Sequence, residues 1–340
     1  MAFVLPLAGR SSGFSLVELM VATALGLLLS AGMVSLYLES RRQFFYDEQL
    51  SRLQENGRYA IDLLSRELAM AGFFSTVLDR KNLVSQAVSR DCSALDWALN
   101  PVAAVDMVND HAPSSAAMDT VQGATLTCVG GQTVVASSDA LIIKRVAGQA
   151  SLRAGRVADN LTPSTTPQWF LRVEDGAAPR WEKRAAADLW SLSGSGGSAS
   201  YWEAITRIFY LRDYSDPQNP ADQLPTLCME SLVNDLMTTR CLVEGVENLQ
   251  IEIGLDTDGD GIANRYAAAP LAQEIELVVA IRVSLLLRST QPLAGYRDEK
   301  EYRVGPLSIA ARQDAFLRRV FVATIQLRNA LHPVEDMELI

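Results

Sequence analysis

Near its beginning the chain has a long segment in which almost every position is apolar. Across residues 14–38 the only charged side chain is that of Glu18. A helix needs ~20 predominantly apolar residues to span the hydrocarbon core of a bilayer, so this segment predicts a membrane-spanning helix. An unpaired carboxylate inside lipid costs about 3 kcal/mol, and Glu18, near the start of the helix, therefore calls for a partner.

A second pattern follows, in which apolar residues recur at steps of three and four. This spacing predicts that the helix continues with one apolar stripe, packed on a globular domain, and one solvated face. Gly72 is a natural end because a helix terminus favours the positive φ of glycine; we expect a helix over about 14–71, with a bend at Gly57. The stripe comprises Leu50, Leu53, Ala60, Ile61, Leu64, Leu68 and Ala71, and the solvated face comprises Glu48, Arg52, Glu55, Arg58, Asp62, Arg66 and Glu67.

After Phe74 the pattern changes to short β-branched runs separated by turn-rich segments. Strands are predicted over 140–146, 204–211, 249–254, 276–288 and 320–328, with a loop over 191–200 and a turn region over 215–225. In the fourth strand, Ile281, Val283, Leu285 and Leu287 share an apolar side, opposite Arg282, Ser284 and Arg288. A helix followed by strands favours an α+β fold, with the long N-terminal helix packed on a globular antiparallel β-sheet domain.

Composition and charge narrow the function classes. The 340 residues are 49% hydrophobic and 21% charged, so the part beyond the apolar helix is expected to fold. The formal net charge of −10 argues against a nucleic-acid partner, because no basic stripe is available to neutralise phosphates.

The chain has four cysteines, Cys92, Cys128, Cys228 and Cys241, and the absence of any C-x-x-C spacing among them argues against a zinc site. In an oxidising compartment two disulfides are expected, most simply Cys92–Cys128 and Cys228–Cys241. Three connectivities are possible and the sequence does not choose among them. Four free buried thiols are the alternative.

The chain offers little for catalysis. His111 and His332 are its two histidines, and neither adjoins an obvious nucleophile or metal ligand. The string from Gly9 to Gly13 matches G-x-S-x-G, but it enters an apolar helix without a preceding strand, so the context of a nucleophile elbow is missing. No phosphate-binding glycine loop is present in the sequence. We expect a protein that is not an enzyme.

A short acidic segment is the sharpest polar motif. Asp256, Asp258 and Asp260 alternate along the chain, Gly261 permits a tight turn, Ile262 offers its backbone carbonyl, and Asn264 occupies the ninth position of a calcium loop. The twelfth position, where an EF-hand has a bidentate glutamate, is alanine. The motif therefore predicts an incomplete calcium loop with Ca²⁺ as the cofactor; the alternative is a polar hairpin turn between two strands.

The residues around the start of the apolar helix resemble a known processing signal. A secretory signal has an apolar region of ~7–15 residues followed by its cleavage site, whereas here a small residue precedes a longer apolar run. The match to the class III signal of type IV prepilins and pseudopilins comprises Gly13, Phe14, Ser15, Leu16, Val17, Glu18 and Leu19. The resemblance implies cleavage after Gly13 by a prepilin peptidase, N-methylation of Phe14, and a role for Glu18 in filament assembly.

Later segments resemble one branch of this family. Residues 55–60 and 67–73 look like those of minor pilins and larger pseudopilins, and residues 242–251 and 318–329 resemble PilW-type minor pilins. The implied organisation is a leader over 1–13, a membrane or filament-core helix over 14–38, its amphipathic continuation over 39–72, and a periplasmic or extracellular β-rich pilin domain over 73–340.

The resemblance implies a minor pilin that helps to prime type IV pilus assembly and to form a tip complex. It would cross the inner membrane once, with its C-terminal domain in the periplasm, and would become extracellular in the pilus. Its partners would be other minor pilins, the major pilin, a tip adhesin, the prepilin peptidase and the inner-membrane assembly platform, consistent with roles in cell adhesion and twitching motility. The alternatives are a type II secretion pseudopilin at the pseudopilus tip and a membrane-anchored periplasmic enzyme or binding protein.

Overall fold

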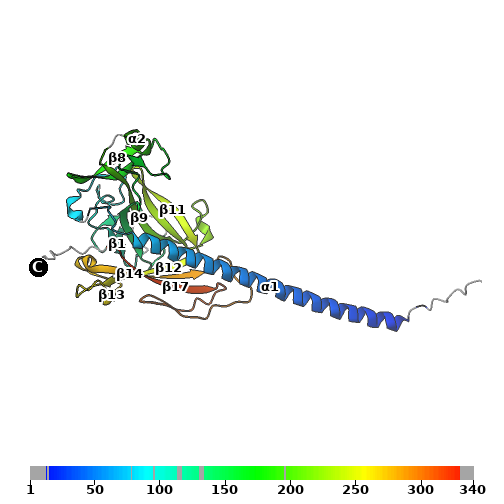
Figure 1. The fold of residues 1–340 in the computed structure, drawn as a ribbon. Helices are drawn as coiled ribbons and strands as arrows, with labels where there is room; N and C mark the ends of the chain where they lie inside the picture. The colour runs from blue at the N-terminus through cyan, green and yellow to red at the C-terminus, as the bar shows by residue number, and fades with distance from the viewer. Residues whose placement is uncertain are drawn as a thin grey trace, which may run out of the picture. The chain divides into compact units, whose positions relative to one another are not determined.

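The computed structural model describes residues 13, 15–77, 79–94, 96–112, 117–129, 134–194 and 197–329. The chain divides into two compact units, Met1–Gln49 and Leu50–Ile340. The helix α1 (Leu16–Ala69) contributes residues to both units. Figure 1 shows this helix and the strands of the second unit.

Over residues 16–38 α1 is apolar on all sides, apart from Glu18, and every one of these residues is exposed. Among the described residues, α1 is a helix that is long and apolar enough to cross a membrane. Its most apolar 18-residue window has a mean hydropathy of 2.1, and 0% of that window is buried. Leu27 and Leu36, for example, are 72% and 74% exposed. A monomer in water rarely exposes apolar surface on this scale, so this part of the helix requires lipid or other protein around it.

In the second unit the helix buries the predicted stripe. Leu53, Ala60, Leu64, Leu68 and Ala71 are buried, which confirms the three- and four-residue spacing. The helix ends at Ala69, two residues before the expected position, because a turn leads from there into Gly72, whose φ is +74° as a C-terminal glycine requires.

One charged residue was wrongly placed on the solvated face. Glu67 is 8% exposed, and its carboxylate accepts hydrogen bonds from Arg145 and Arg207, with 2.9 Å between Arg145 Nη2 and Glu67 Oε2. The arginines come from two neighbouring strands of a sheet, so the glutamate joins the last helical turns to that sheet. Sequence spacing alone does not reveal partners so distant along the chain.

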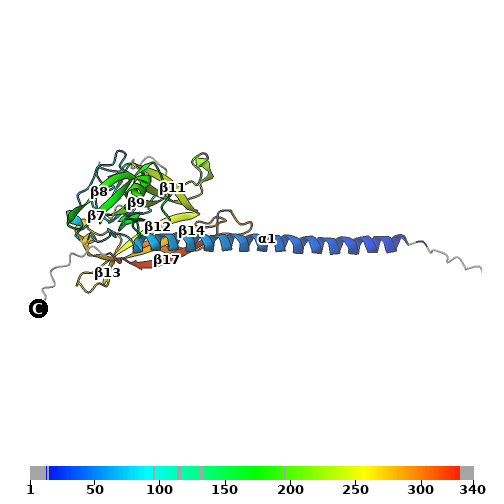
Figure 2. The ribbon, with the colours of Figure 1, turned by 45° about the horizontal axis from the view of Figure 1, so that its top comes forward.

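Antiparallel strands form two large sheets beside the helix (Figure 2). The nine-stranded sheet has the path β1 (Val105–Val108), β4 (Ala140–Val146), β9 (Ser200–Arg212), β10 (Thr226–Val233) and β11 (Leu236–Glu244), with β5 (Leu152–Arg153), β6 (Arg156–Val157), β7 (Pro167–Glu174) and β8 (Ala177–Ala185) off this path. The four-stranded sheet has the order β13 (Arg265–Ala267), β12 (Val246–Leu255), β14 (Val278–Arg288) and β17 (Arg318–Gln326).

Smaller elements complete the second unit. They are the hairpins β2 (Met118–Asp119) with β3 (Thr125–Leu126) and β15 (Tyr302–Val304) with β16 (Leu307–Ile309), the helix α2 (Ala186–Leu192), and the 3₁₀ turns η1 (Arg80–Asn82), η2 (Pro220–Asp222) and η3 (Ala272–Leu277). The structure thus confirms the α+β class and each of the five predicted strands, although residues 276 and 277 belong to η3. It also divides the expected β domain into two sheets.

Strand β14 is buried on both of its faces, and here the expectation of a polar side was incomplete. Ser284 is 1% exposed, and Leu286 packs with Tyr302, Val304 and Ile309 under the β15–β16 hairpin. The turn of that hairpin approaches closely at Gly305, which has a φ of +56° and would place a Cβ 3.2 Å from Gln250 Cβ. The hairpin therefore covers the sheet face on which the alternation along β14 placed Arg282, Ser284 and Arg288.

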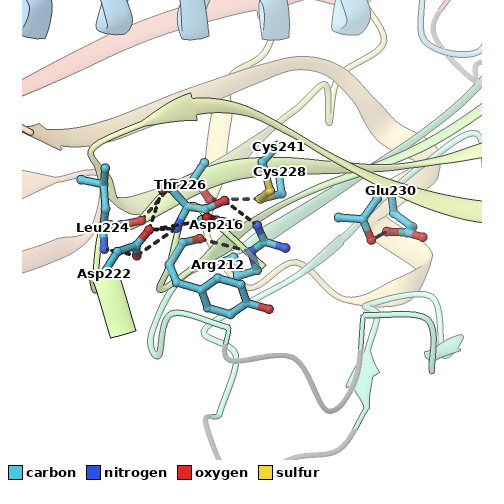
Figure 3. The surroundings of a disulfide bond; sticks show 11 residues. Arg212, Asp216, Asp222, Leu224, Thr226, Cys228, Glu230 and Cys241 are labelled. Atoms are coloured by element: carbon cyan, nitrogen blue, oxygen red, sulfur yellow. Dashed lines mark hydrogen bonds between the residues drawn. A yellow bond between two sulfur atoms is a disulfide. The ribbon is translucent and has the colours of Figure 1, made fainter. Parts of the chain in front are cut away.

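Two disulfides link segments of the second unit. Cys92 is joined to Cys128 and Cys228 to Cys241, the pairing that is simplest from the sequence. Cys228 and Cys241 are cross-strand partners in β10 and β11, beside the turn that Asp222 organises (Figure 3). Closing a loop of this size removes unfolded-state entropy worth ~3 kcal/mol in the chain-entropy model, so both bonds are expected to stabilise the unit.

Candidate functional site

The processing motif lies at the beginning of α1. Gly13 is described and exposed, whereas Phe14, the expected methylation position, lies outside the described residues. The first helical hydrogen bond runs from the Leu19 N–H to the Ser15 carbonyl, over 3.0 Å. The cleavage position of the motif thus lies directly before the helix, so a cut after Gly13 would leave the whole apolar helix on the mature protein.

Glu18 occupies the first turn of this helix and is exposed. A carboxylate there interacts favourably with the unpaired N–H groups of the helix start, by ~0.3–1 kcal/mol in water. No other described residue pairs with it, so its side chain is available to a group from another molecule. In lipid such a partner would also relieve the cost of burying the charge.

Two hydroxyl side chains within the apolar part of α1 already have hydrogen-bond partners in the helix. Thr23 Oγ1 donates to the Met20 carbonyl over 3.0 Å, and Ser35 Oγ donates to the Ala31 carbonyl over 2.9 Å. Buried hydroxyls are costly only when they lack a partner, so these two groups can enter an apolar environment at little cost. Glu18 is then the main polar obstacle to burial of this segment.

The acidic loop forms the hairpin connection between β12 and β13, where Leu255 pairs with Arg265. One carboxylate oxygen from each of Asp256, Asp258 and Asp260 lies within 4.8 Å of the others. Asp256 is 2% exposed, and its two oxygens accept from the Gly259 and Gly261 N–H groups, each over 2.7 Å. A triad of carboxylates of this kind, with Asp256 buried and Asp258 and Asp260 exposed, can bind a metal ion, because hard cations prefer such oxygen ligands.

The charge of Asp256 is supported by its surroundings. Burial acts to raise the pKa of this carboxyl, but the N–H groups of Gly261 and Gly259 outweigh it, so the pKa is lowered from its ordinary value. Asp256 therefore remains an anion in the presence or absence of a cation.

The other two loop positions behave differently from the aspartates. Asn264 Oδ1 accepts hydrogen bonds from both Thr257 N and Thr257 Oγ1, over 3.2 and 3.0 Å. The Ile262 N–H donates to Asp260 Oδ1 over 2.8 Å, and its side chain is 67% exposed. The structure thus brings the three carboxylates together and uses Asn264 to brace the loop.

The turn region over 215–225 is likewise organised by one carboxylate (Figure 3). Asp222 accepts from Ser215 Oγ over 2.7 Å and from the Leu224 N–H over 3.0 Å. Burial acts to raise its pKa, but these hydrogen bonds prevail and lower the pKa to about 2. Both carboxylate oxygens of Asp222 accept hydrogen bonds from residues of the same loop, so this segment has a structural role.

Two buried charged groups had no signal in the sequence. Lys144 Nζ donates to the Trp97 carbonyl and lies 4.2 Å from the centre of the Trp97 ring, and burial lowers its pKa to about 7. Arg318 pairs with Glu247, Asp298 and Asp314. In both cases a charged side chain on a strand binds groups of neighbouring loops. A single lysine or arginine in a strand sequence does not indicate such partners.

The histidines show no catalytic arrangement among the described residues. The side chain of His111 is buried, with 6% of the residue exposed, and burial lowers its pKa. The backbone N–H of His111 donates to the Ser138 carbonyl. His332 and the residues from Gly9 to Ser12 lie outside the described part of the chain.

Comparison with known proteins gives two family matches. Residues 208–329 match the family model described as type IV pilus-assembly protein W, and residues 9–34 match the prokaryotic N-terminal methylation motif. Among curated proteins, none matches. A solved structure, the type IV-like pilin TTHA1219 from Thermus thermophilus, aligns with 13% identity and a TM-score of 0.34 over 83% of this chain and 99% of that one.

The two matches agree with the geometry. The methylation motif covers the start of the exposed apolar helix, and the other match covers the end of β9 from residue 208 and all of β10–β17, including the acidic loop and the whole four-stranded sheet. Residues 208–329 are thus similar to the type IV pilus-assembly protein W (PilW) family, and residues 9–34 carry the prokaryotic N-terminal methylation motif.

Proposed function

We propose that this protein is a minor pilin of the type IV pilus, incorporated into the filament through α1. The observation that carries the proposal is the methylation motif at the head of a helix whose most apolar segment is not buried by the rest of the chain. Such a helix fits lipid before assembly and a bundle of like helices afterwards. The chain would wait in the inner membrane as a single-pass protein until it is extracted.

Glu18 provides a means of placing the subunit. After cleavage behind Gly13, the α-amino group of Phe14 would be a cation four residues from this glutamate in sequence. The glutamate of an entering subunit can pair with the Phe14 ammonium of a neighbour, and both charges would lie in an apolar core, where an unpaired charge is costly. The pairing would favour one axial position over its neighbours.

The size of the second unit favours a place at the tip, together with other minor pilins, the major pilin and an adhesin. A unit that contains two sheets and two disulfides is easier to accommodate at a filament end than along a crowded shaft. In that place it would help to prime assembly. We further propose that the acidic loop binds Ca²⁺, because three oxygens around one centre suit that ion.

The experiment is mass spectrometry of the N-terminus in membranes and in filaments sheared from the cell surface. A methylated Phe14 terminus in both fractions is expected. An intact Met1, or a cut after the apolar segment, would overturn the proposal. A methylated terminus in membranes alone, with secretion rather than surface filaments lost on deletion of the gene, would instead support a type II secretion pseudopilin.

A further inference from the structure

A cleft of about 580 Å³ lies where four loops of the second unit meet. Its walls come from the chain after α1 (Phe73 and Thr76), the end of β5 and the β5–β6 turn (Arg153 and Ala154), the β7–β8 turn (Asp175) and the segment before β9 (Ser198). The volume falls in the ~300–1,000 Å³ range of small-molecule sites. Loops held by a sheet are common positions for binding residues.

Aromatic rings form part of the cleft lining. Phe73 and Trp202 meet edge to face with 5.8 Å between their ring centres. The Trp202 Nε1–H donates to Ser200 Oγ over 3.1 Å, and Ser200 Oγ donates to the Val173 carbonyl over 3.2 Å. These bonds fix the indole, which is 8% exposed, so the small aromatic surface that it and Phe73 present to the cleft is preorganised for a ligand with apolar C–H faces.

The cleft also presents two charges without partners. Arg153 and Asp175 are exposed, and neither forms an ion pair or hydrogen bond with any other described residue. The adjacent Glu174, in contrast, accepts from Arg172 over 2.6 Å. One guanidinium and one carboxylate together give no net charge, which disfavours phosphate and other anions and leaves strong donors and acceptors for hydroxyl groups.

We propose that this cleft binds a neutral saccharide of two or three sugar units. Sugars combine C–H faces, which pack on aromatic rings, with hydroxyls that both donate and accept. The cleft supplies both kinds of partner, since Ser75, Thr76 and Ser198 add hydroxyls to the two charged groups. The inference is independent of the filament proposal, because it uses only residues of the second unit.

The test uses the full-length chain in a detergent without a sugar headgroup. The probes are maltotriose, chitotriose and lactose, and binding is measured by titration calorimetry. At least one probe is expected to bind saturably. Arg153→Gln and Asp175→Asn should each weaken that binding by about tenfold or more, because each removes a charge-assisted hydrogen bond.

Two matched variants serve as controls. Arg156 is the cross-strand partner of Arg153 on the β5–β6 hairpin, and Asp159 is a nearby exposed carboxylate; neither lines the cleft. Arg156→Gln and Asp159→Asn should bind the probe as the native chain does, and all four variants should melt like it. The proposal is overturned if no probe binds at ~10 mM, a concentration that detects Kd values even weaker than 1 mM. It is equally overturned if both cleft variants bind normally or if inorganic phosphate displaces the sugar.

Discussion

At position 57 the helix lacks a side chain because the ring of Phe321, on β17, occupies that space. A Cβ there would lie 2.3 Å from two atoms of the ring and 2.6 Å from a third. The glycine lies within the continuous helix α1, where it costs ~1 kcal/mol relative to alanine when exposed. Close approach of helix and strand therefore accounts for a residue that the sequence suggested as the place of a bend.

Gly57→Ala is expected to destabilise the second unit by ~1–3 kcal/mol, since the ring must move to admit the methyl group. The measurement is chemical unfolding of the full chain in detergent. Gly32→Ala is the matched control, because no atom lies within 4 Å of a Cβ at that helical position. In the Phe321→Ala background the cost of Gly57→Ala should vanish. An equal cost in both backgrounds would contradict this account.

Asp139 lies at the seam between the two sheets. Its Oδ2 accepts from the Ile251 N–H of β12 over 2.6 Å, and its own N–H donates to the Leu249 carbonyl over 2.9 Å. Burial is the main cause that raises its pKa, to about 7, and the nearby Asp110 contributes in the same direction. The charged form is thus less stable in the folded than in the unfolded chain.

The stability of the chain should consequently depend on pH between about 4 and 7. Below the unfolded pKa of 3.8 the carboxyl is neutral in both states, and its penalty is absent; the penalty grows until pH exceeds the folded value of about 7. Unfolding free energies measured from pH 4.5 to 7.5 should fall by on the order of 2 kcal/mol from this group. Asp139→Asn should flatten the profile, and an unchanged slope would refute the assignment.

Among the elements, the helix and the apolar strands were predictable, and the polar strands were not. Strand β4 begins and ends where the sequence predicted, because its apolar run is buried on both faces. Strand β8, with the sequence AAPRWEKRA, lies at the edge of its sheet, and all of its residues except Trp181 are exposed or half-buried. Its charged residues therefore hide the apolar alternation that would indicate a strand. The strand forms because it pairs with β7, with Leu171 opposite Trp181. This pairing cannot be predicted from the spacing of residues within β8 alone.

The candidate sites divide in the same way. Glu18 and the three aspartates follow local motifs, and a reader of the sequence finds them at once. The saccharide cleft draws residues from four separate loops, so only the folded chain brings Arg153 and Asp175 together. Contacts between distant segments, such as that of Glu67 with Arg145, escape the sequence for the same reason.

The acidic hairpin makes a prediction at the scale of the element. Calcium bound to the folded loop should stabilise the chain by ~2.7 kcal/mol at a free concentration 100-fold above Kd. Removal of calcium with a chelator should lower the melting temperature, and Asp258→Asn or Asp260→Asn should abolish the difference. Asp159→Asn should preserve it. Equal melting temperatures with and without calcium would mean that the loop is only a polar turn.

For the whole molecule, the contrast between the two units matters most. The second unit buries its own core and carries disulfides, whereas the described helix of the first unit buries none of its most apolar window. The first unit must therefore obtain its surroundings from lipid or from other subunits. Across residues 14–38 Glu18 is the only charged side chain, so it bears the largest cost on burial and gains the most from a partner.

Glu18→Ala should therefore separate membrane insertion from filament assembly. Insertion should persist, because the alanine makes the helix more apolar. Recovery in sheared surface filaments should fall by tenfold or more, since the Phe14 ammonium of a neighbour would be left buried without its partner, at a cost of about 3–5 kcal/mol. Glu39→Ala, which removes an exposed carboxylate from the same helix outside its most apolar part, is the control and should assemble normally. Equal recovery of both variants would show that Glu18 contributes nothing to placement, and the charge would then need another explanation in so apolar a helix.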